Sequence, residues 1–405
     1  MTEPAGAGPR GLRGLPRNVW AASLCSLLMD ISSEMVLNLL PLYLSNALHV
    51  GTAAIGLLEG VAESAASLLK VFSGWFSDRL GNRKWLAVAG YALSAVVRPL
   101  FYFAESLSTV AVARWTDRVG KGVRTAPRDA LLADSVPPEQ RGLVFGFHRA
   151  ADSAGAVLGL GGALLVVWLT QGGTSRLEAS TFRLVALVSI LPALLAVAVL
   201  AGGAREPARA SGEASSPVRL TLVSRDFGRF LLMVGLFQLG NSADAFLVLR
   251  GQERGLSVLG VLGMLMTFNL IYSLVSTAGG ALSDRVGRRS VIIAGWLTYA
   301  LLYLGFALAR SGWQVGAAYA LYGVYYGLAY GTERALVADL VPAAQRGTAY
   351  GTYNAVVGFA TLPASLLAGV LWQGVGPAAP FYCGAALALV AALLLAAWRP
   401  VPRPQ

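Results

Sequence analysis

The sequence predicts an all-α membrane protein with twelve transmembrane helices in two pseudo-symmetric six-helix bundles. Hydrophobic residues make up 56% of the 405 residues and charged residues only 13%, whereas a soluble domain carries about a quarter charged residues. Apolar runs close to the roughly 20 residues that cross a bilayer recur along the whole chain. Two sequence signatures each occur twice, once in either half.

The spans are predicted in order from these apolar runs. In a first bundle (19–201) and a second bundle (227–398) they cover residues 19–47, 53–77, 85–104, 108–133, 142–169, 181–202, 228–249, 257–282, 290–309, 313–338, 348–373 and 379–398. The bundles are joined by residues 202–226, whose Gly, Ser, Pro and Arg content predicts a cytoplasmic linker. Residues 1–18 and 399–405 are predicted to be cytoplasmic tails, and we expect no signal peptide, because the first apolar run is too long for one.

The net charge of +11 indicates topology rather than nucleic-acid binding, because the basic residues gather in loops of one parity. By the positive-inside rule, both termini are expected in the cytoplasm. The absence of Asn-x-Ser/Thr sequons favours a prokaryotic plasma membrane, which we expect to be an inner membrane. Cys25 and Cys383 lie inside predicted spans, so no disulfide is expected. The basic loops contain these residues: Arg79, Arg83, Lys84, Arg205, Arg209, Arg219, Arg225, Arg285, Arg288 and Arg289.

The duplicated signatures identify a family. "GWFSDRLGNRK" at 74–84 and "GALSDRVGRR" at 280–289 share the frame Gly-x-x-x-Asp-Arg-x-Gly, and "ALLADSVPPEQRGLVFG" at 130–146 is echoed by "ALVADLVPAAQRGTAYG" at 335–351. Internal repeats of this size build the two halves of many transporters. The paired motif resembles the cytoplasmic loop signature of the major facilitator superfamily, and this resemblance extends over essentially the whole chain.

The resemblance implies a gating role for the paired motif. Asp78 and Asp284 end their helices at the cytoplasmic face, where a carboxylate can meet the positive end of a helix from the other half. With the neighbouring arginines, such a contact holds the inner gate shut in family members. The candidate gating residues are Gly74, Asp78, Arg79, Gly81, Arg83, Gly280, Asp284, Arg285, Gly287, Arg288 and, from the tenth span, Glu333. The alternative is that they only fix loop shape and topology.

Two carboxylates in the first span, Asp30 and Glu34, are one helical turn apart and therefore share a face. At about 1.5 Å per residue, Asp30 lies about 16 Å from the inner surface, near the membrane midplane. In the fourth span, Arg118 and Arg114 fall at matching depths. Intramembrane charges normally pair, so Asp30 is expected to face Arg118, and Glu34 to face Arg114. A static structural network is the alternative.

Further candidates for substrate binding or proton coupling lie nearby: Glu63, Asp117, Lys121 and Asp152. The segment from Arg118 to Ala126 resembles the helix-4 motif of proton-coupled antiporters, with Lys121 at the position usually held by Gln. The resemblance implies an antiporter that exports its substrate. Protonation of a carboxylate that loses its arginine would bias the rocking of the halves.

The second half carries fewer buried charges. Asn241 and Asp244 lie on the outer part of the seventh span. In the tenth span Tyr319, Tyr322, Tyr326 and Tyr330 share one face, and Tyr322 and Tyr326 are predicted to contact the substrate. Packing against neighbouring helices is the alternative role for these tyrosines.

We therefore predict a secondary active transporter, a proton-coupled exporter of a small amphipathic or anionic organic solute. It is expected to act as a monomer in the lipid bilayer, without a cofactor. One alternative is export of a metal ion or chelate through Asp30, Glu34, His148 and Asp152. Another is a transporter-like sensor or assembly protein that moves nothing. Because the sequence has no Walker-type loop or zinc-ligand cluster, we do not expect an enzyme.

Overall fold

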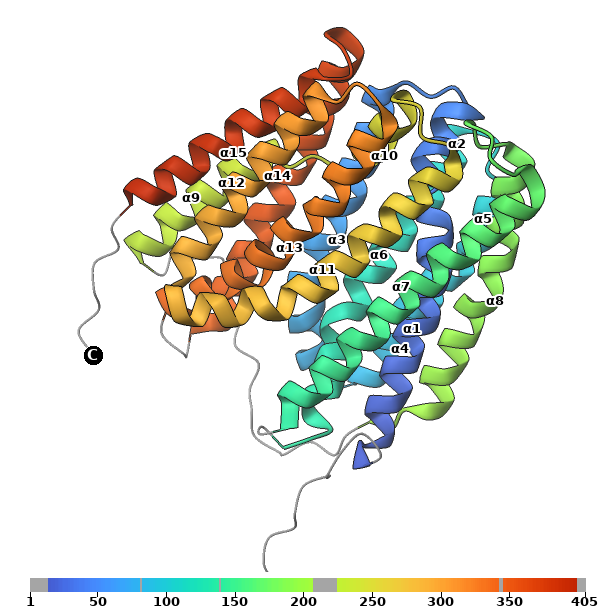
Figure 1. Ribbon diagram of the computed structural model, residues 1–405. Coiled ribbons are helices and arrows are strands. Elements are labelled where there is room, and N and C mark those ends of the chain that lie inside the picture. Colours follow the sequence, from blue (N-terminus) through green and yellow to red (C-terminus); the bar gives the residue numbers. More distant parts are fainter. Residues whose placement is uncertain (1–13, 81, 138–139, 207–223, 342–344, 399–405) are drawn as a thin grey trace, which may run out of the picture.

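The computed structural model describes residues 14–80, 82–137, 140–206, 224–341 and 345–398, and the elements in these ranges are helices (Figure 1). The first half contains α1 (Arg17–Leu37), α2 (Leu40–Asn46), α3 (Thr52–Leu80), α4 (Arg83–Val96), α5 (Arg98–Tyr102), α6 (Leu107–Asp134), α7 (Arg141–Gln171) and α8 (Ala179–Gly203). The second half contains α9 (Arg225–Gly240), α10 (Ala245–Glu253), α11 (Val258–Val286), α12 (Arg288–Leu308), α13 (Gly312–Leu340), α14 (Arg346–Gly374) and α15 (Ala379–Ala397). This arrangement is the predicted all-α fold.

Three of the predicted continuous spans are broken in the middle or near one end. The first divides into α1 and α2, the third into α4 and α5, and the seventh into α9 and α10. Pro41 and Pro99 lie in the first turn of α2 and of α5, where a proline that lacks an N–H does not continue the preceding helix. The break between α9 and α10 contains Asn241 and Ser242, whose short polar side chains compete with helical backbone bonds.

Ten helical segments in the described residues are long and apolar enough to cross a membrane. Neither α6 nor α13 is among them, although each is as long as its neighbours. α6 carries Arg114, Asp117, Arg118, Lys121 and Arg124 within less than three turns, which lowers its hydropathy. The charges of α6 therefore have to be satisfied inside the protein.

Apart from α3 and α14, which pack extensively on each other across the halves, the helices pack mainly within their own half. In the first half α1 contacts α7 and α8, and α6 contacts α3 and α4; in the second half α12 contacts α13 and α15, and α11 contacts α13. The principal contacts between the halves join α3 to α14, α7 to α11, and α2 to α10. α8 ends at Gly203 and α9 begins at Arg225, and most of the predicted linker (202–226) lies outside the described residues.

The start of α1 and the end of α15 lie on the same side of the molecule, which we call the termini side; the opposite side is the far side. The two halves contact each other on the far side. On the far side Gln252 Nε2 of α10 donates to the carbonyl of Ser175 at 2.6 Å, and the Val258 N–H donates to the carbonyl of Thr174 at 3.2 Å. α3 and α14 approach closely from Gly369 at Thr52 down to Gly358 at Ser67. α7 also contacts α11, and Figure 1 shows these two helices diverging toward the termini side.

Candidate functional site

A cavity of about 480 Å³ lies between the two halves. Its wall in the first half comes from α1, α3 and α6, and its wall in the second half from α9, α10, α11, α13 and α14. The breaks after α1 and after α9 both border it, through Asn38 on one side and Asn241 to Asp244 on the other. These breaks occupy related places in the two halves, so polar backbone and side-chain groups reach the cavity from both halves.

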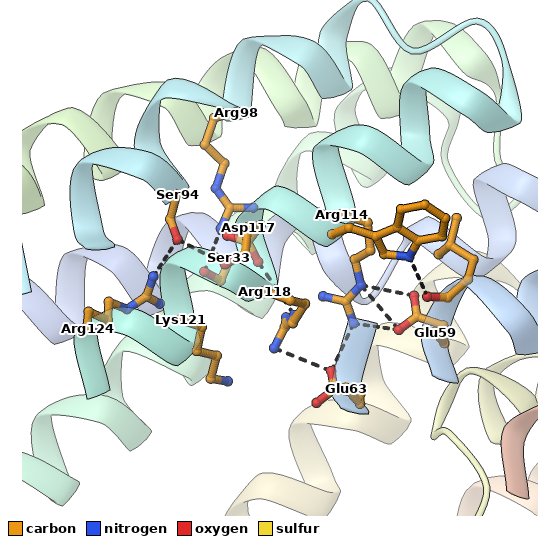
Figure 2. A network of polar contacts seen from close by, with 12 residues as sticks. Ser33, Glu59, Glu63, Ser94, Arg98, Arg114, Asp117, Arg118, Lys121 and Arg124 are labelled. Carbon is orange, nitrogen blue, oxygen red and sulfur yellow. Dashed lines mark hydrogen bonds and ion pairs between the residues drawn. The ribbon is translucent and has the colours of Figure 1, made fainter. Parts of the chain in front are cut away.

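The first-half wall is a network of charges on α3 and α6 (Figure 2). The Arg114 guanidinium binds the Glu59 carboxylate, with Nη2 at 2.5 Å from Oε2 and Nε at 3.2 Å from both oxygens. Glu63 lies between two arginines, with Oε1 at 3.1 Å from Arg114 Nη2 and 3.4 Å from Arg118 Nη1. Trp115 Nε1 donates to the Leu58 carbonyl and fixes the same turn of α6 against α3.

The predicted partners of these arginines are wrong. Arg114 and Arg118 pair with Glu59 and Glu63 of α3, not with Glu34 and Asp30 of α1. The physical reason is the helix packing, because α6 lies along α3 whereas α1 lies mainly along α7 and α8. A matching depth along two helices does not determine which helix is the neighbour.

Glu34 and Asp30 instead face the glycines of α7. A Cβ at Gly155 would lie 3.0 Å from the Asp30 Cβ, and one at Gly159 would lie 3.0 Å from the Glu34 Cβ. Glu34 reaches the cavity and accepts a hydrogen bond from Asn38 Nδ2 at 2.7 Å, next to the helix break. Asp30 is half-buried, does not line the cavity, and has no hydrogen bond or ion pair among the described contacts.

Asp117 lies behind the network rather than in the cavity. Its Oδ1 accepts a hydrogen bond from Arg98 Nη2 at 2.9 Å, and Arg98 also donates to Ser33 Oγ of α1 at 2.8 Å. Asp117 Oδ2 is 3.6 Å from Arg118 Nε. Because Arg98 is fully buried and Asp117 nearly so, this pair positions Arg118 and joins three helices instead of touching a substrate.

Asp152 is also away from the cavity. Its Oδ1 is 3.6 Å from His148 Nε2 on the same helix, and His148 Nδ1 is 3.4 Å from the hydroxyl of Ser23 on α1. These contacts place Asp152 between α7 and α1, in the same interhelical layer as Asp30. No group of three or more His, Cys, Asp or Glu side chains in the described ranges is arranged to hold a metal ion.

Lys121 lines the cavity one turn beyond Arg118, and Figure 2 shows its ammonium group outside the dashed contacts of the network. Lys70 of α3 and Arg334 of α13 line the same cavity. Arg334 donates to the Tyr330 hydroxyl at 3.0 Å, and its guanidinium carbon lies 4.7 Å from the centre of that ring. For these three cations the described residues provide no ion pair, in contrast to Arg114 and Arg118.

The polar part of the second-half wall is the break between α9 and α10. Asn241 Nδ2 donates to Gln238 Oε1 at 3.1 Å, and the Tyr299 hydroxyl donates to the Gly240 carbonyl at 2.9 Å. Asp244, half-buried at the start of α10, faces the cavity without a hydrogen bond or ion pair from its carboxylate in the described contacts. Both residues are therefore where a solute could reach them.

The aromatic part of the wall is formed by Tyr319, Tyr325, Tyr326 and Tyr330 of α13, with Phe268 of α11. The prediction that Tyr322 lines the cavity is wrong. Tyr322 is fully buried behind this wall, among the rings of Tyr299, Tyr303, Phe306 and Phe381 that form one cluster. α13 packs on α11 and α12 at once, so a stripe of tyrosines with one helical spacing divides between cavity and core.

The gating motif is described in part. Gly81 lies outside the described residues, and so do the side chains of Asp78, Arg79 and Asp284 and the surroundings of Gly74 and Gly280. Arg285 is exposed at the end of α11, and Gly287 takes a φ of +92°, a conformation that favours glycine, at the turn into α12.

Arg83 and Arg288 make matching ion pairs, which were not foreseen. Arg83 pairs with Asp134, and Arg288 Nε is 3.4 Å from Asp339 Oδ2, so that each pair joins two helices of one half. The Arg83 and Lys84 N–H groups also donate to Glu206 at 2.8 and 2.7 Å. These described contacts therefore stabilise a half rather than hold the two halves together.

Glu333 lines the cavity and accepts hydrogen bonds from Trp296 Nε1 at 2.8 Å and from the Tyr353 hydroxyl at 2.6 Å. Both donors belong to the second half, so the described contacts of Glu333 do not join the two halves as a gating residue would. Sequence reasoning also missed Glu59, Lys70, Arg98 and Arg334 as site residues. For Glu59 a signal existed, because Glu59 and Glu63 have the same spacing of four as Arg114 and Arg118 on a parallel helix.

Comparisons with known proteins agree with this architecture. The family model of the Major Facilitator Superfamily matches residues 22–272 and 230–405. An uncharacterized MFS-type transporter of Methanocaldococcus jannaschii is 33% identical over 389 residues, which cover 95% of each chain. The cis,cis-muconate transport protein of Acinetobacter baylyi is 24% identical over 395 residues, which cover 90% of this chain and 91% of that protein.

Solved structures with the same fold include transporters of several kinds. A bacterial homologue of the human lysosomal transporter Spinster, in an inward-facing and occupied conformation, has a TM-score of 0.72 at 16% identity and covers 93% of this chain and 94% of its own. A D-xylose–proton symporter also has a TM-score of 0.72 at 16% identity, with 95% and 98% of the two chains covered. At this level of identity the likeness concerns the fold.

Proposed function

The chain belongs to the major facilitator superfamily, and from this premise we propose that it exports a small anionic or amphipathic organic solute in exchange for protons. As a member of that family it is a multi-pass membrane transporter of small molecules. The solute class, the proton coupling and the direction of transport are the proposed parts.

The observation that carries the proposal is the pairing of two unlike walls around one cavity between the halves. A charged wall with Arg114, Arg118 and Lys121 faces a tyrosine wall with Tyr325 and Tyr326. A volume of about 480 Å³ lies within the range of about 300–1,000 Å³ that is typical of small-molecule sites. Cations and aromatic faces together favour a solute with an anionic group and an apolar body.

Proton exchange is assigned to carboxylates that lack a cationic partner. Glu59 and Glu63 are bound by arginines, whereas no ion pair is described for Asp244, which borders the cavity, or for Asp30, between α1 and α7. An ionised carboxylate without a partner is costly away from water, so uptake or release of a proton accompanies changes in its surroundings. Rocking of one half against the other changes those surroundings at Asp244, on the cavity wall. At Asp30, inside the first half, they change where α1 shifts against α7 during that movement.

The muconate relative supports the anionic solute class. Muconate is a dicarboxylate, and the protein named for its transport resembles this chain over nearly its full length. The metal alternative has less support, because the described carboxylates and histidines do not form a metal-binding group. The sensor or assembly alternative leaves the cavity without a role.

We also propose a prokaryotic inner-membrane location with the termini side in the cytoplasm, and a monomer as the working unit. Basic side chains gather on the termini side, where Arg17 binds the carbonyls at the end of α8 and Arg289 binds those at the end of α15. The positive-inside rule places such a side in the cytoplasm. Since the far side is the one where the halves meet, the cavity of this conformation then faces the cytoplasm, from which an exporter loads its solute.

The test is solute-driven proton movement in proteoliposomes that contain a trapped pH indicator. We use cis,cis-muconate, benzoate and succinate as probes, with their uncharged methyl esters as controls. Addition of a transported acid is expected to change the internal pH, and a protonophore is expected to abolish the change. Asp30→Asn and Asp244→Asn should uncouple proton movement from solute movement, and Arg118→Ala should slow solute movement.

Glu105→Gln is the matched control, because Glu105 is an exposed carboxylate that pairs with Arg183 on the surface. It is expected to behave as the wild type. Proton movement that is unchanged in both aspartate variants contradicts the coupling scheme. Transport of a cationic or uncharged solute, with no response to any acid, contradicts the solute class while leaving the family assignment intact.

A further inference from the structure

The interface between α1 and α7 carries a series of titratable side chains outside the solute cavity. The two helices lie side by side (Figure 1), and three pairs of residues that meet across them are each separated by the same 125 positions of the chain. A constant separation means that α1 and α7 run parallel in one register. The pairs are Ser23 with His148, Asp30 with Gly155, and Glu34 with Gly159.

In this register the titratable groups follow one another from the termini side to the cavity. At about 1.5 Å per residue, Ser23 and His148 lie about 9 Å beyond the start of α1. Asp152 is one turn further along α7, and Asp30 lies about 4–5 Å beyond it, at the level of Gly155. Glu34 is one turn beyond Asp30 and reaches the cavity. The series therefore spans about 16 Å from His148 to the cavity wall.

The polar atoms of this series are not taken up by structural hydrogen bonds. His148 is only 4% exposed, and its Nε2 lies 3.6 Å from Oδ1 of Asp152. Both atoms are buried, and neither has a hydrogen-bond partner among the described contacts. Asp30, one step further, has no described hydrogen bond or ion pair either. Buried polar groups without partners cost free energy, so three in one line indicate a role other than stability.

The related interface in the second half shows that helix packing does not require such groups. The repeat places Tyr353 and Val357 of α14 where α7 has His148 and Asp152, and α14 packs on α9 as α7 packs on α1. Residues 230–240 of α9 and 353–364 of α14 contain no Asp, Glu, His, Lys or Arg. The same pair of helices is thus assembled there without a titratable series.

The neighbouring helices bring mainly cations to this interface. Arg128 of α6 donates to Ser26 Oγ of α1 at 3.0 Å and pairs with Asp129 at 2.8 Å. Arg183 of α8 pairs with Glu105 at the surface. Cations near His148 disfavour a lasting positive charge on its ring, so that the ring holds a transferred proton only in passing. The charges that act on His148 are those of Arg128, Asp129 and Arg149, and those that act on Asp30 are Lys121, Arg124, Glu34 and Asp152.

We propose that Asp152 and His148 form a proton path between Asp30 and the termini side, separate from the solute cavity. This inference rests on the proposed function, because it routes the proposed proton exchange through named residues. Asp152 takes the proton from protonated Asp30 and passes it from Oδ1 to His148 Nε2. The ring then releases a proton from Nδ1 toward the Ser23 hydroxyl and the termini side. Each group gives up the proton that it takes, so its charge is restored after every transfer.

The step between Asp30 and Asp152 is the one that movement of the protein can switch, because these two residues belong to different helices. Proton transfer needs hydrogen-bond reach or a single bridging water, and a shift of α1 against α7 makes or breaks that reach. Solute enters the cavity from the termini side, whereas the proton leaves through the α1–α7 interface. The two therefore do not compete for one opening. Glu34 gives Asp30 its second access, from the cavity.

The experiment compares two rates in proteoliposomes that contain the full chain. The first is acid-driven proton movement, measured with a trapped pH indicator, and the second is exchange of labelled for unlabelled acid at equal pH. The probes are cis,cis-muconate, benzoate and succinate. Exchange of solute for solute needs no net proton transfer. His148→Asn and Asp152→Asn should therefore slow proton movement at least tenfold and leave exchange within about twofold of the wild type, since neither residue lines the cavity.

His49→Asn is the matched control, because His49 is the other histidine of the chain and is exposed. It should match the wild type in both assays. Asp152→Glu keeps a carboxylate and should restore at least half of the proton movement that Asp152→Asn loses. Ser23→Ala removes only a hydroxyl, and so tests the path even if the His148 variant does not fold. It should slow proton movement about threefold, and an unchanged rate in it overturns the path.

The outcomes separate this path from the function on which it rests. Wild-type proton movement in the His148 and Asp152 variants overturns the path and leaves the proposed exchange intact. Equal losses of proton movement and of solute exchange show a structural role for the two residues, which also overturns the path. If no acid drives proton movement in the wild type, the path falls together with the proposed proton exchange.

Discussion

Arg114 and Glu59 form a bidentate ion pair inside the first half. The guanidinium Nη2 lies 2.5 Å from Oε2, and Nε lies 3.2 Å from both carboxylate oxygens. Each residue is only 5% exposed, so each charge depends on the other for its solvation. The pair joins α6 to α3, and Glu63 extends it to Arg118. This arrangement keeps arginines in a cavity wall without leaving them all free to bind solute.

Glu59→Gln is expected to destabilise the protein by about 3–5 kcal/mol, because it leaves a buried guanidinium with one partner fewer. Replacement of both residues, Glu59→Gln with Arg114→Gln, should recover a large part of that loss. Thermal unfolding of the purified variants in detergent measures both effects. Additive losses in the double variant would show that the two side chains act independently.

Asp117→Asn should destabilise the protein by a similar amount, about 3–5 kcal/mol, since Arg98 is fully buried and pairs with Asp117. Because Asp117 does not border the cavity, the affinity for solute should change less than the stability. Glu105→Gln at the surface is expected to stay within about 0.5 kcal/mol of the wild type. A stable Asp117→Asn protein with altered affinity would instead place Asp117 in the substrate site.

The fold could be predicted from the sequence because its signals are repeated and one-dimensional. Apolar runs give the spans, the duplicated Gly-x-x-x-Asp-Arg-x-Gly frame gives the two halves, and the family resemblance gives their arrangement. The breaks beside Asn38 and Asn241 were missed, since the apolar runs continue through both of them. Hydropathy reports the environment of a segment and does not report whether its backbone is helical throughout.

The site was predicted in part for a related reason. The prediction that charges of α6 are interior groups is confirmed by their burial, but Asp30 and Glu34 have the same spacing along their helix as Glu59 and Glu63. Only the packing of α6 along α3 selects the second pair. Tyr322 shows the same limit, because neighbours of α13 on two sides decide which tyrosines reach the cavity.

Gly155→Ala is expected to destabilise the packing of α1 on α7 by about 1–3 kcal/mol. A Cβ at this position would lie 2.5 Å from the Leu27 carbonyl oxygen and 3.0 Å from the Asp30 Cβ, so the helices have to separate. Gly161→Ala on the same helix is the control, because its Cβ would have no heavy atom within 4 Å. Thermal unfolding compares the two; equal stability would mean that the α1–α7 contact adjusts without cost.

The contact between Gln252 and the Ser175 carbonyl is expected to favour the conformation in which the far side is closed, since it joins the two halves there. One hydrogen bond contributes about 0.5–1.5 kcal/mol to stability. Gln252→Ala should therefore shift the equilibrium between the conformation closed on the far side and the one open there about two- to tenfold toward the open one. Spin labels at Phe145→Cys on α7 and Leu282→Cys on α11, both exposed and near the termini side, measure this shift as a larger population at short distance, in a chain whose Cys25 and Cys383 are replaced by alanine. Gln314→Ala is the control, because Gln314 accepts a hydrogen bond from the Arg310 N–H within the second half. An identical distance distribution in the Gln252 and Gln314 variants would show that the contact follows the closure of the far side without stabilising it.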